Sequence, residues 1–341
     1  MKFRLGLCLV VAGVSLAILG GATGVVFALT NGDCPTLAYR DRLFDATFAT
    51  EDQGWVVGYP GIVLTTPDGG KSWKRACDLS EQALFAVDFL DADHGWIVGR
   101  AGKVISTADG GGNWFKHDAV CEEPLFDVDF VDSQHGWAVG NFGRVIRTVD
   151  GGKTWIKEIL EPMANASINA LYMHDAQNGF LVGEYPAWEA ALDEDVSADT
   201  LSNMFRTHDG GATWEIVQVG THFALYDIVF RDAQHGWAVG TKGTLVRTVD
   251  GGETWEKIAT GTEVNLFKAA VAPDAVYAVG VAGVVLKIVG DKVEIIDLKA
   301  YSWLASAAFS PKGNGIIIGG RGTLFFKEEA GADWKRLPFS I

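Results

Sequence analysis

A short phrase that recurs seven times along the chain constrains its fold more than any other feature. The phrase reads His-Gly-Trp-Ile-Val-Gly at 94–99, and close copies stand at 135–140 and 235–240. Four looser copies keep a large apolar residue at the position of the tryptophan. That position falls at 55, 96, 137, 180, 237, 277 and 316, so one repeat takes about forty residues, except for one longer interval. A period of this length is typical of solenoids, propellers and other repeat arrays.

One repeat, from Leu84 to His117, has the pattern of four short strands. Residues 84–89 alternate between apolar and polar, residues 96–99 are apolar, and residues 103–107 and 113–116 follow after polar or glycine-rich turns. Four antiparallel strands in each repeat are the signature of a propeller blade, and blades stack because both faces of each are apolar. We therefore predict an all-β fold: a seven-bladed β-propeller of four-stranded antiparallel blades over 43–341, preceded by one N-terminal transmembrane helix.

The two ends of the repeat array indicate how the ring closes. The first repeat opens with its own first strand at Phe44–Phe48, and the last ends with its own fourth strand at Trp334–Leu337. We therefore expect the first and last blades to pack face to face without sharing strands. Whether residues 34–42 add a lacing strand is left open.

The N-terminus carries an uncharged run over residues 5–30, preceded by Lys2 and Arg4 and followed by Asp33. A bilayer core requires about 20 apolar residues, and the flanking charges favour a cytoplasmic N-terminus. We predict a cytoplasmic segment at 1–4, a transmembrane anchor or signal segment at 5–30 and a linker at 31–42. This places the protein in the cell inner membrane as a single-pass protein, with the propeller on the periplasmic side. The alternative is secretion after cleavage of a signal peptide.

Charge and cysteine content narrow the partners and the compartment. The net charge is −15 and the pI about 4.8, which argues against binding nucleic acid. Export would place Cys34, Cys77 and Cys121 where disulfides persist. Cys77 and Cys121 occupy similar places in consecutive repeats, so we expect that pair to bridge. The alternative is three free thiols.

The turn between the third and fourth strands has the pattern Thr-x-Asp-Gly-Gly-x-[Thr/Ser/Asn]-Trp in five repeats. Asp accepts hydrogen bonds within its own turn, glycine supplies positive φ, and the tryptophan packs the turn onto the blade. We assign these residues a structural role. They are Asp68, Asp109, Asp150, Asp209 and Asp250, with Trp73, Trp114, Trp155, Trp214 and Trp255.

These five turns match the Asp box, or bacterial neuraminidase repeat. Together with the His-Gly-Trp phrase and the membrane-proximal start, they make the chain similar to the photosystem II stability and assembly factor family over roughly residues 38 to 340. The resemblance implies a propeller that binds newly made segments of membrane proteins as an assembly chaperone, without catalysis or cofactor. It does not identify the client or a photosynthetic host.

Asp boxes also occur in sialidases, so an enzyme is the alternative. Arg147, Arg206 and Arg247 stand at matched positions just before the Asp-box threonine, and Lys287 continues the series. They are candidates for binding a partner, although each could simply pack its stem on the blade, because the position belongs to the repeat. We find no sialidase-type Phe-Arg-Ile-Pro phrase and no tyrosine with a glutamate partner. The histidines and acids show no metal-ligand spacing, so we expect neither a metal nor catalytic residues.

Blade four departs from the repeat by an insertion at about 184–203. It falls after the second strand, on the face opposite the Asp boxes. Insertions of this kind often mark the binding face of repeat proteins, so Tyr185 and Trp188 join the candidate partner-binding residues. The alternative is a surface loop without a role. The function predicted is a membrane-tethered scaffold for a membrane protein or membrane-protein complex.

Overall fold

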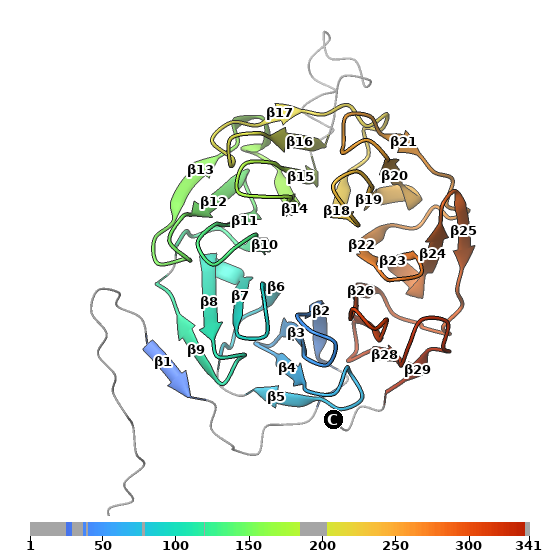
Figure 1. Cartoon of the computed structure of the whole chain (residues 1–341), viewed down its shortest axis with the longest axis horizontal. Helices are drawn as coiled ribbons and strands as arrows, with labels where there is room; N and C mark the ends of the chain where they lie inside the picture. Colours follow the sequence, from blue (N-terminus) through green and yellow to red (C-terminus); the bar gives the residue numbers. More distant parts are fainter. Residues whose placement is uncertain are drawn as a thin grey trace, which may run out of the picture.

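The computed structural model describes residues 25–28, 37–38, 40–76, 79–118, 120–184 and 203–337. Over these residues, seven sheets stand around a central axis like the blades of a propeller (Figure 1). Each sheet is formed by four consecutive antiparallel strands, the first innermost and the fourth at the rim. The predicted seven-bladed β-propeller is confirmed.

The strands follow the repeats predicted from the sequence. Blade 1 contains β2 (Arg42–Phe48), β3 (Gly54–Tyr59), β4 (Val63–Thr66) and β5 (Lys74–Ala76); blade 2 contains β6 (Leu84–Phe89), β7 (His94–Gly99), β8 (Lys103–Ala108) and β9 (Asn113–Lys116). Blade 3 contains β10 (Leu125–Phe130), β11 (Gly136–Gly140), β12 (Arg144–Thr148) and β13 (Ile156–Ile159); blade 4 contains β14 (Ser167–Met173), β15 (Gly179–Glu184), β16 (Met204–Thr207) and β17 (Glu215–Ile216). Blade 5 contains β18 (Leu225–Phe230), β19 (Gly236–Gly240), β20 (Leu245–Thr248) and β21 (Glu256–Lys257). Blade 6 contains β22 (Leu266–Val271), β23 (Val276–Gly280), β24 (Val285–Val289) and β25 (Lys292–Ile295); blade 7 contains β26 (Leu304–Phe309), β27 (Gly315–Gly319), β28 (Leu324–Lys327) and β29 (Lys335–Arg336). Short 3-10 turns are η1 (Arg100–Gly102), η2 (Glu161–Met163), η4 (Thr241–Gly243) and η5 (Val281–Gly283).

The second strand of each blade explains the repeated phrase. In β11 all five residues are buried, because this strand has neighbouring strands on both sides and a neighbouring blade on each face. A Cβ atom on Gly136 would come within 2.4 Å of the Phe130 ring, and one on Gly140 within 2.0 Å of the Pro124 carbonyl oxygen. Glycine is therefore required at both ends of the strand by close packing against the start and end of β10.

The aromatic residue of the phrase joins one blade to the next. Trp96 of blade 2 stacks on Phe130 of blade 3, with ring centroids 3.5 Å apart and planes within 6°. Trp155, from the Asp box of blade 3, meets the same Phe130 edge-on at 6.0 Å. Trp55, Phe89 and Trp114 repeat this arrangement one blade earlier. The hydrophobic core accordingly consists of seven clusters within the described residues, each lying between two adjacent blades.

The ring closes as predicted, by packing blade 7 on blade 1 without a shared sheet. Leu43 and Leu64 of blade 1 lie in one core cluster with Ile316 and Phe326 of blade 7. An isolated bridge between Arg42 and Gly320 adds backbone contacts at the seam. The residues described between 37 and 41 form no strand, so they do not lace the ring.

A fifth strand on blade 2 is a feature that the sequence did not predict. β1 (Val25–Ala28) pairs antiparallel with the outer edge of β9, Val25 opposite Lys116 and Ala28 opposite Asn113. These four residues belong to the segment 5–30 that we predict to be a transmembrane anchor or signal. The remainder of that segment lies outside the described residues, and within them no helix is long and apolar enough to cross a membrane. The anchor remains a prediction.

The expected bridge between Cys77 and Cys121 is wrong, because the structure shows Cys121 as a free, buried thiol. Its Sγ donates to the carbonyl oxygen of Glu123 at 3.5 Å. Burial raises the pKa of this thiol to about 11. Cys77 itself lies outside the described residues.

Candidate functional site

The five Asp boxes form closed hydrogen-bond circuits at one end of the propeller. In blade 3, Thr148 Oγ1 donates to Asp150 Oδ1 at 2.8 Å and accepts from the Gly152 amide at 2.9 Å. The other carboxylate oxygen of Asp150 accepts from Thr154 Oγ1 at 2.6 Å. The same set of bonds recurs around Asp68, Asp109, Asp209 and Asp250.

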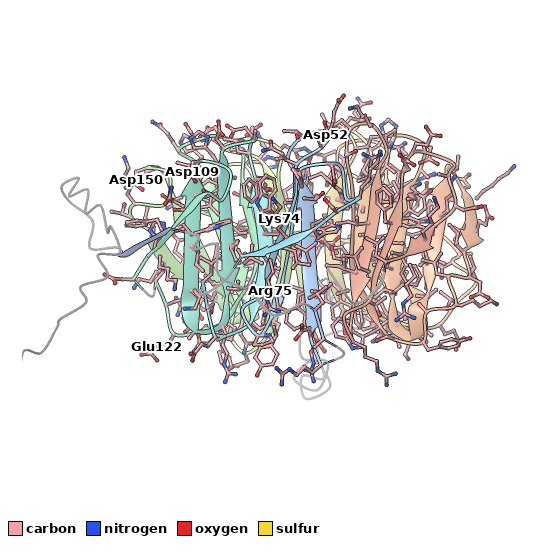
Figure 2. All side chains as sticks on the ribbon, turned by 90° about the horizontal axis from the view of Figure 1, so that it is seen from below. Asp52, Lys74, Arg75, Asp109, Glu122 and Asp150 are labelled. Atoms are coloured by element: carbon pink, nitrogen blue, oxygen red, sulfur yellow. The ribbon has the colours of Figure 1, made fainter. Side chains whose placement is uncertain are left out.

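These bonds occupy the carboxylates within their own turns. Partial burial opposes ionisation of Asp150, but the bonds from Thr154 and Thr148 outweigh it and lower the pKa of the carboxyl group. These bonds hold the turn together, which is the role that the sequence pattern predicts for the Asp-box residues. We call this end of the propeller the Asp-box face. Figure 2 shows Asp109 and Asp150 at this end and Glu122 at the other.

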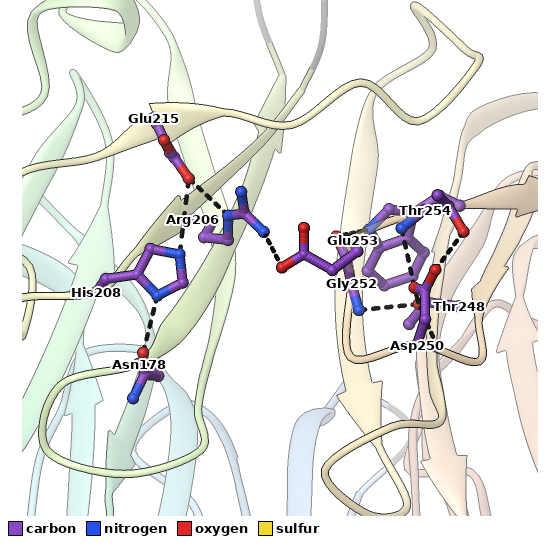
Figure 3. Close-up of polar contacts among 10 residues, drawn as sticks. Asn178, Arg206, His208, Glu215, Thr248, Asp250, Gly252, Glu253 and Thr254 are labelled. Atoms are coloured by element: carbon purple, nitrogen blue, oxygen red, sulfur yellow. Dashed lines mark hydrogen bonds and ion pairs between the residues drawn. The ribbon is translucent and has the colours of Figure 1, made fainter.

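The basic series predicted as a candidate site lies on the third strands of four blades, one residue to a blade. Arg147 pairs with Glu158 on the adjacent strand at 3.2 Å. Arg206 pairs with Glu215 of its own blade and with Glu253 of the next blade, each at 2.7 Å (Figure 3).

The remaining two members of the series are also paired within the chain. Arg247 repeats the pattern with Glu256 and, at 2.6 Å, with Asp291 of the following blade. Lys287 bonds to Asp274 at 2.8 Å. The structure does not gather the four side chains into one site. It uses them to join strands and neighbouring blades.

The two strands that flank the insertion in blade four are β15 and β16. β15 ends at Glu184 and the described chain resumes at Asn203, whose Nδ2 donates to the His222 and Phe223 carbonyl oxygens at 3.0 Å. β15 and β16 are joined at the end away from the Asp boxes. Tyr185 and Trp188 lie outside the described residues, so their role remains a prediction.

The central channel contains a group of charged residues that the sequence analysis did not single out. The innermost strands surround a cavity of about 300 Å³. Its polar lining includes five carboxylates and one amine. They are Asp45, Asp88, Asp127, Asp129, Asp227 and Lys268.

The channel carboxylates connect each innermost strand to the next blade. Such a strand is an edge strand, so some of its amides face the channel without a partner strand. Asp127 Oδ2 accepts from the Leu171 amide at 2.9 Å, and Asp129 Oδ2 from the Met173 amide at 2.6 Å. Asp45, Asp88 and Asp227 bond to the next blade in the same way, through the amides of Val87, Phe130 and Ala269. These bonds satisfy donors that would otherwise be buried and unpaired.

Burial raises the pKa values of Asp88, Asp127, Asp129 and Asp227. It raises the pKa of Asp127 to about 7 and those of Asp88 and Asp227 to about 6. Burial also raises the pKa of Asp129 well above its usual value, and the nearby charge of Asp88 adds to the effect. Burial opposes the charge of Lys268, but the carboxylates of Asp227, Asp45 and Asp127 outweigh it and raise the lysine pKa.

Aromatic side chains surround the mouth of the channel at the end opposite the Asp boxes. Each innermost strand begins at this end, and the residue after its first buried leucine is aromatic in five blades. Phe44, Phe85 and Phe126 form a continuous arc with ring centroids 5.5 and 5.6 Å apart, and Trp303 extends it at 6.1 Å from Phe44. Tyr226 and Phe267 form a second pair at 5.6 Å.

We call these six residues the aromatic collar and this end of the propeller the collar face. All six side chains are partly exposed. Partly exposed aromatic side chains gathered at one mouth are suited to binding an apolar partner, because aromatic residues dominate the energetics of protein interfaces.

A repeat-by-repeat alignment could have found the collar. Phe44, Phe85 and Phe126 each follow the first buried leucine of their strand, where the alternation predicts an outward side chain. Their gathering at one mouth could not be inferred, because it depends on the strand ends meeting around the channel.

Chemistry based on a metal finds no support in the described residues, where no group of three or more His, Cys, Asp or Glu side chains could hold a metal ion. His94, His135 and His235 occupy the same turn in different blades, as expected. Each bonds to the Asp three residues before it, namely Asp91, Asp132 and Asp232.

Fold and repeats together define the class: the protein is an Asp-box seven-bladed propeller of the bacterial neuraminidase repeat type. A family model described as photosynthesis system II assembly factor YCF48 matches residues 114–193 and 207–291. The model thus matches the repeats from the last strand of blade 2 to blade 6, just under half of the chain. A comparison with curated protein sequences finds no match.

Solved structures of YCF48 share the architecture. A structure of YCF48 bound to D1 peptide aligns with a TM-score of 0.65 and 23% identity, covering 90% of this chain and 97% of that one. YCF48 from Cyanidioschyzon merolae aligns with a TM-score of 0.65 and 20% identity, covering 88% and 98%. An inactive variant of virginiamycin B lyase from Staphylococcus aureus reaches the same TM-score at 9% identity, covering 89% and 97%. Because this enzyme has the same fold, the fold alone does not decide function.

Proposed function

We propose that this protein is a non-catalytic scaffold that binds a segment of a membrane-protein client and so aids the assembly or stability of a membrane complex. The observation that carries the proposal is the match of the YCF48 assembly factor model to the central blades. The YCF48 structure with a bound D1 peptide supports a propeller of this kind as a peptide receptor.

The collar face is the binding surface that the geometry favours. It joins the aromatic collar, the open channel mouth and the base of the blade-four insertion on one end of the ring. The Asp-box face has its carboxylates engaged within their own turns. An apolar client segment would bury the partly exposed Phe44, Phe85 and Phe126, and each aromatic side chain adds substantially to binding when it is covered.

The positions of the charged residues support a non-catalytic role. A glycoside hydrolase requires two carboxyl groups a few ångströms apart on one substrate site. Here the channel carboxylates each accept a backbone N–H of the next blade, as Asp127 does from Leu171. Arg147, Arg206 and Arg247 are paired with carboxylates of the chain itself, so they do not converge on a substrate anion.

We further propose that residues 5–30 hold the propeller at the inner membrane, on its extracytoplasmic side. Val25 pairs with Lys116, at the collar-face end of β9. Residues 5–24 alone supply the ~20 residues that a membrane span requires. A membrane segment entering before Val25 would direct the collar face toward the bilayer and a membrane-protein client. Release after signal cleavage is the alternative, and the mass of the mature protein in membrane and soluble fractions separates the two.

Crosslinking in membranes, followed by capture of the tagged full-length protein, tests the proposed function. A variant with Phe85→Ser and Phe126→Ser removes collar rings that are already partly exposed. The matched control carries Val149→Ser and Val249→Ser, which remove exposed apolar side chains from the Asp-box face. We expect the wild type and the control to capture the same membrane protein, and the collar variant to lose it.

Two results would overturn the proposal. The first is that the wild-type protein captures no membrane protein. The second is that purified protein hydrolyses a glycan from a sialoside panel and loses this activity in both Arg147→Ala and Arg247→Ala. That result would establish the carbohydrate-active alternative.

A further inference from the structure

The aromatic collar is interrupted in two blades, and the two interruptions differ. In blade 4 the collar position is Asn169, whose Nδ2 donates to the Leu225 carbonyl oxygen at 2.9 Å and so joins blade 4 to blade 5. In blade 7 the position is Ala305, which is too small to reach its neighbours. A cavity of about 490 Å³ opens there between blades 6 and 7.

The cavity at Ala305 is apolar and held open by fixed neighbours. Its lining consists of Phe267, Val281, Trp303 and Ala305, all of them apolar or aromatic. The Trp303 ring stacks on Phe44 at 14°, and a Cβ on Gly320 would come within 2.6 Å of its indole. The tryptophan is therefore packed on both sides. An open apolar hollow of this size suits one large side chain of a partner, the usual anchor of an interface.

The cavity and the charged layer of the channel are lined by residues close together in sequence. Phe267 of the cavity precedes Lys268 of the channel lining in β22, and Ala305 stands two residues before the channel residue Ala307 in β26. A segment anchored at Ala305 can therefore place a neighbouring side chain in the channel.

The channel charges are unequally compensated. Lys268 Nζ lies 3.5 Å from Asp45 Oδ1 and 3.4 Å from Asp227 Oδ1. It is the single cation of the described channel lining, and its charge also opposes the rise in the pKa of Asp127. Asp88, Asp127 and Asp129 each hold one backbone amide with Oδ2. They form a group of carboxyl groups on blades 2 and 3 that a cation from a partner would complement when they are ionised.

We propose that the channel mouth recognises an extended client segment through two side chains: a large apolar one in the Ala305 cavity and a lysine or arginine directed to Asp127 and Asp129. This inference rests on the proposed function and specifies the chemistry of the client. The apolar cavity supplies the anchor, and the carboxylates supply selectivity for charge.

Recognition of the cation depends on pH. Asp127 has a raised pKa of about 7 because of burial. The other titratable groups that line the channel are Asp45, Asp88, Asp129, Asp227, Lys268 and Tyr172. A client cation requires ionised carboxylates, so affinity rises as the pH increases through this range. An uncharged segment would bind without this dependence.

The test uses three synthetic peptides of twelve residues, acetylated, amidated and labelled with a fluorophore. The first carries one tryptophan and one lysine in an otherwise alanine-serine sequence, the second replaces the tryptophan by alanine, and the third replaces the lysine by glutamate. Fluorescence anisotropy at pH 8 and pH 5.5 measures their binding to the full-length protein. We expect the first peptide to bind about tenfold more tightly than either of the others, a factor typical of losing one interface anchor.

Two variants locate the contacts. Ala305→Trp fills the cavity, and we expect it to remove the preference for tryptophan while preserving the preference for lysine. The double variant Asp127→Asn and Asp129→Asn retains side-chain oxygens that can accept the amides of blade 4. It should remove the preference for lysine and the pH dependence. Val149→Ser, on the Asp-box face, serves as control, and thermal unfolding of every variant confirms that the ring is intact.

The possible results distinguish this inference from the proposed function. If folded Ala305→Trp binds the first peptide like the wild type, the cavity is not the anchor site. If the glutamate peptide binds as well as the lysine peptide, the charge preference is wrong. In both cases, client capture that still depends on Phe85 and Phe126 leaves the proposed function standing. If the wild-type protein captures no membrane protein, both proposals are refuted.

Discussion

The Asp-box face and the collar face belong to the same ring but differ in how closely their residues follow the repeat. On the Asp-box face, five turns repeat the same bonds, as Thr148, Asp150 and Gly152 show. On the collar face the equivalent positions vary between blades. Phe85 continues the aromatic arc, Asn169 replaces the ring by a hydrogen bond, and Ala305 leaves a cavity.

The comparison separates positions that hold each blade together from positions that can distinguish one partner from another. A group repeated in every blade is positioned by the blade itself, and the ring separates its copies. A position that breaks the repeat makes one part of the ring unlike the others, which a specific partner requires. The Asp boxes are numerous and self-contained. The collar has one hollow, at Ala305.

The largest expected effect is on stability and comes from the Asp-box tryptophans. Trp114 is fully buried against Phe89, so Trp114→Ala should lower the free energy of unfolding by about 3–5 kcal/mol. Phe85→Ala in the partly exposed collar should cost about 1 kcal/mol. Urea unfolding of the two variants measures the contrast. Equal losses would mean that the collar is as much a part of the core as the Asp box.

The next effect has the opposite sign and concerns the channel. The pKa of Asp127 is raised from 3.8 to about 7 in the folded protein, so the folded state binds its proton more tightly than the unfolded state does. Stability contributed by this group is therefore lost as the pH rises from about 4 through 7. We expect Asp127→Asn to stabilise the protein by about 2 kcal/mol at pH 8 and to leave it unchanged at pH 4.

Unfolding by urea at the two pH values provides the measurement for the Asp127 variant. Asp127→Ala is the matched control, because it also removes the acceptor for the Leu171 amide and should destabilise at both. If Asp127→Asn is less stable than the wild type at pH 8, burial of the ionised carboxylate does not destabilise the protein as we infer.

A smaller loss is expected from one Asp box. Asp150→Ala removes the acceptor of three bonds at the surface and should cost about 1–2 kcal/mol at pH 7. The pKa of this carboxyl group is lowered, so its contribution fades as the pH falls below 4. Thermal unfolding from pH 7 to pH 3 follows this loss. Client capture should be unaffected. If Asp150→Ala loses client capture, the client binds at the Asp-box face and our proposal names the wrong face.

The smallest effect belongs to the ion pairs at the rim. Arg206 lies between Glu215 and Glu253, whose side chains are more than half exposed. Exposed pairs of this kind contribute about 0–1 kcal/mol and weaken with salt. A double-mutant cycle with Arg206→Ala and Glu253→Ala should give a coupling in that range at low salt and none at 1 M. A much larger coupling would mean that this contact between blades 4 and 5 helps to hold the ring together.

The sequence predicted the structural residues better than the candidate site. Trp96 and Gly140 could be assigned because the repeat phrase carries their local requirements, a buried aromatic residue and a glycine at a close approach. Asp150 and Thr148 could be assigned because their bonds close within a few residues. Asp127 and Phe85 were missed as site residues, since their importance comes from neighbours in other blades.

For the predicted basic series, the sequence identified the repeated position but not the contacts of its side chains. Arg147, Arg206 and Arg247 were correctly recognised as one repeated position, but a repeat cannot reveal whether such a residue faces a ligand or a carboxylate of the next blade. Glu253 and Asp291 supply the answer, and both come from later repeats.

By itself, the sequence determined the number of blades, the strands within each blade, the geometry of the Asp boxes and the face on which blade four departs from the repeat. These features depend on bonds and periodicities within about forty residues. Only the tertiary structure decided what the ring brings together: Phe44 beside Trp303, Lys268 between Asp45 and Asp227, and the hollow at Ala305. The physical reason is closure, because blade 7 meets blade 1 only after the whole chain has stacked around the channel.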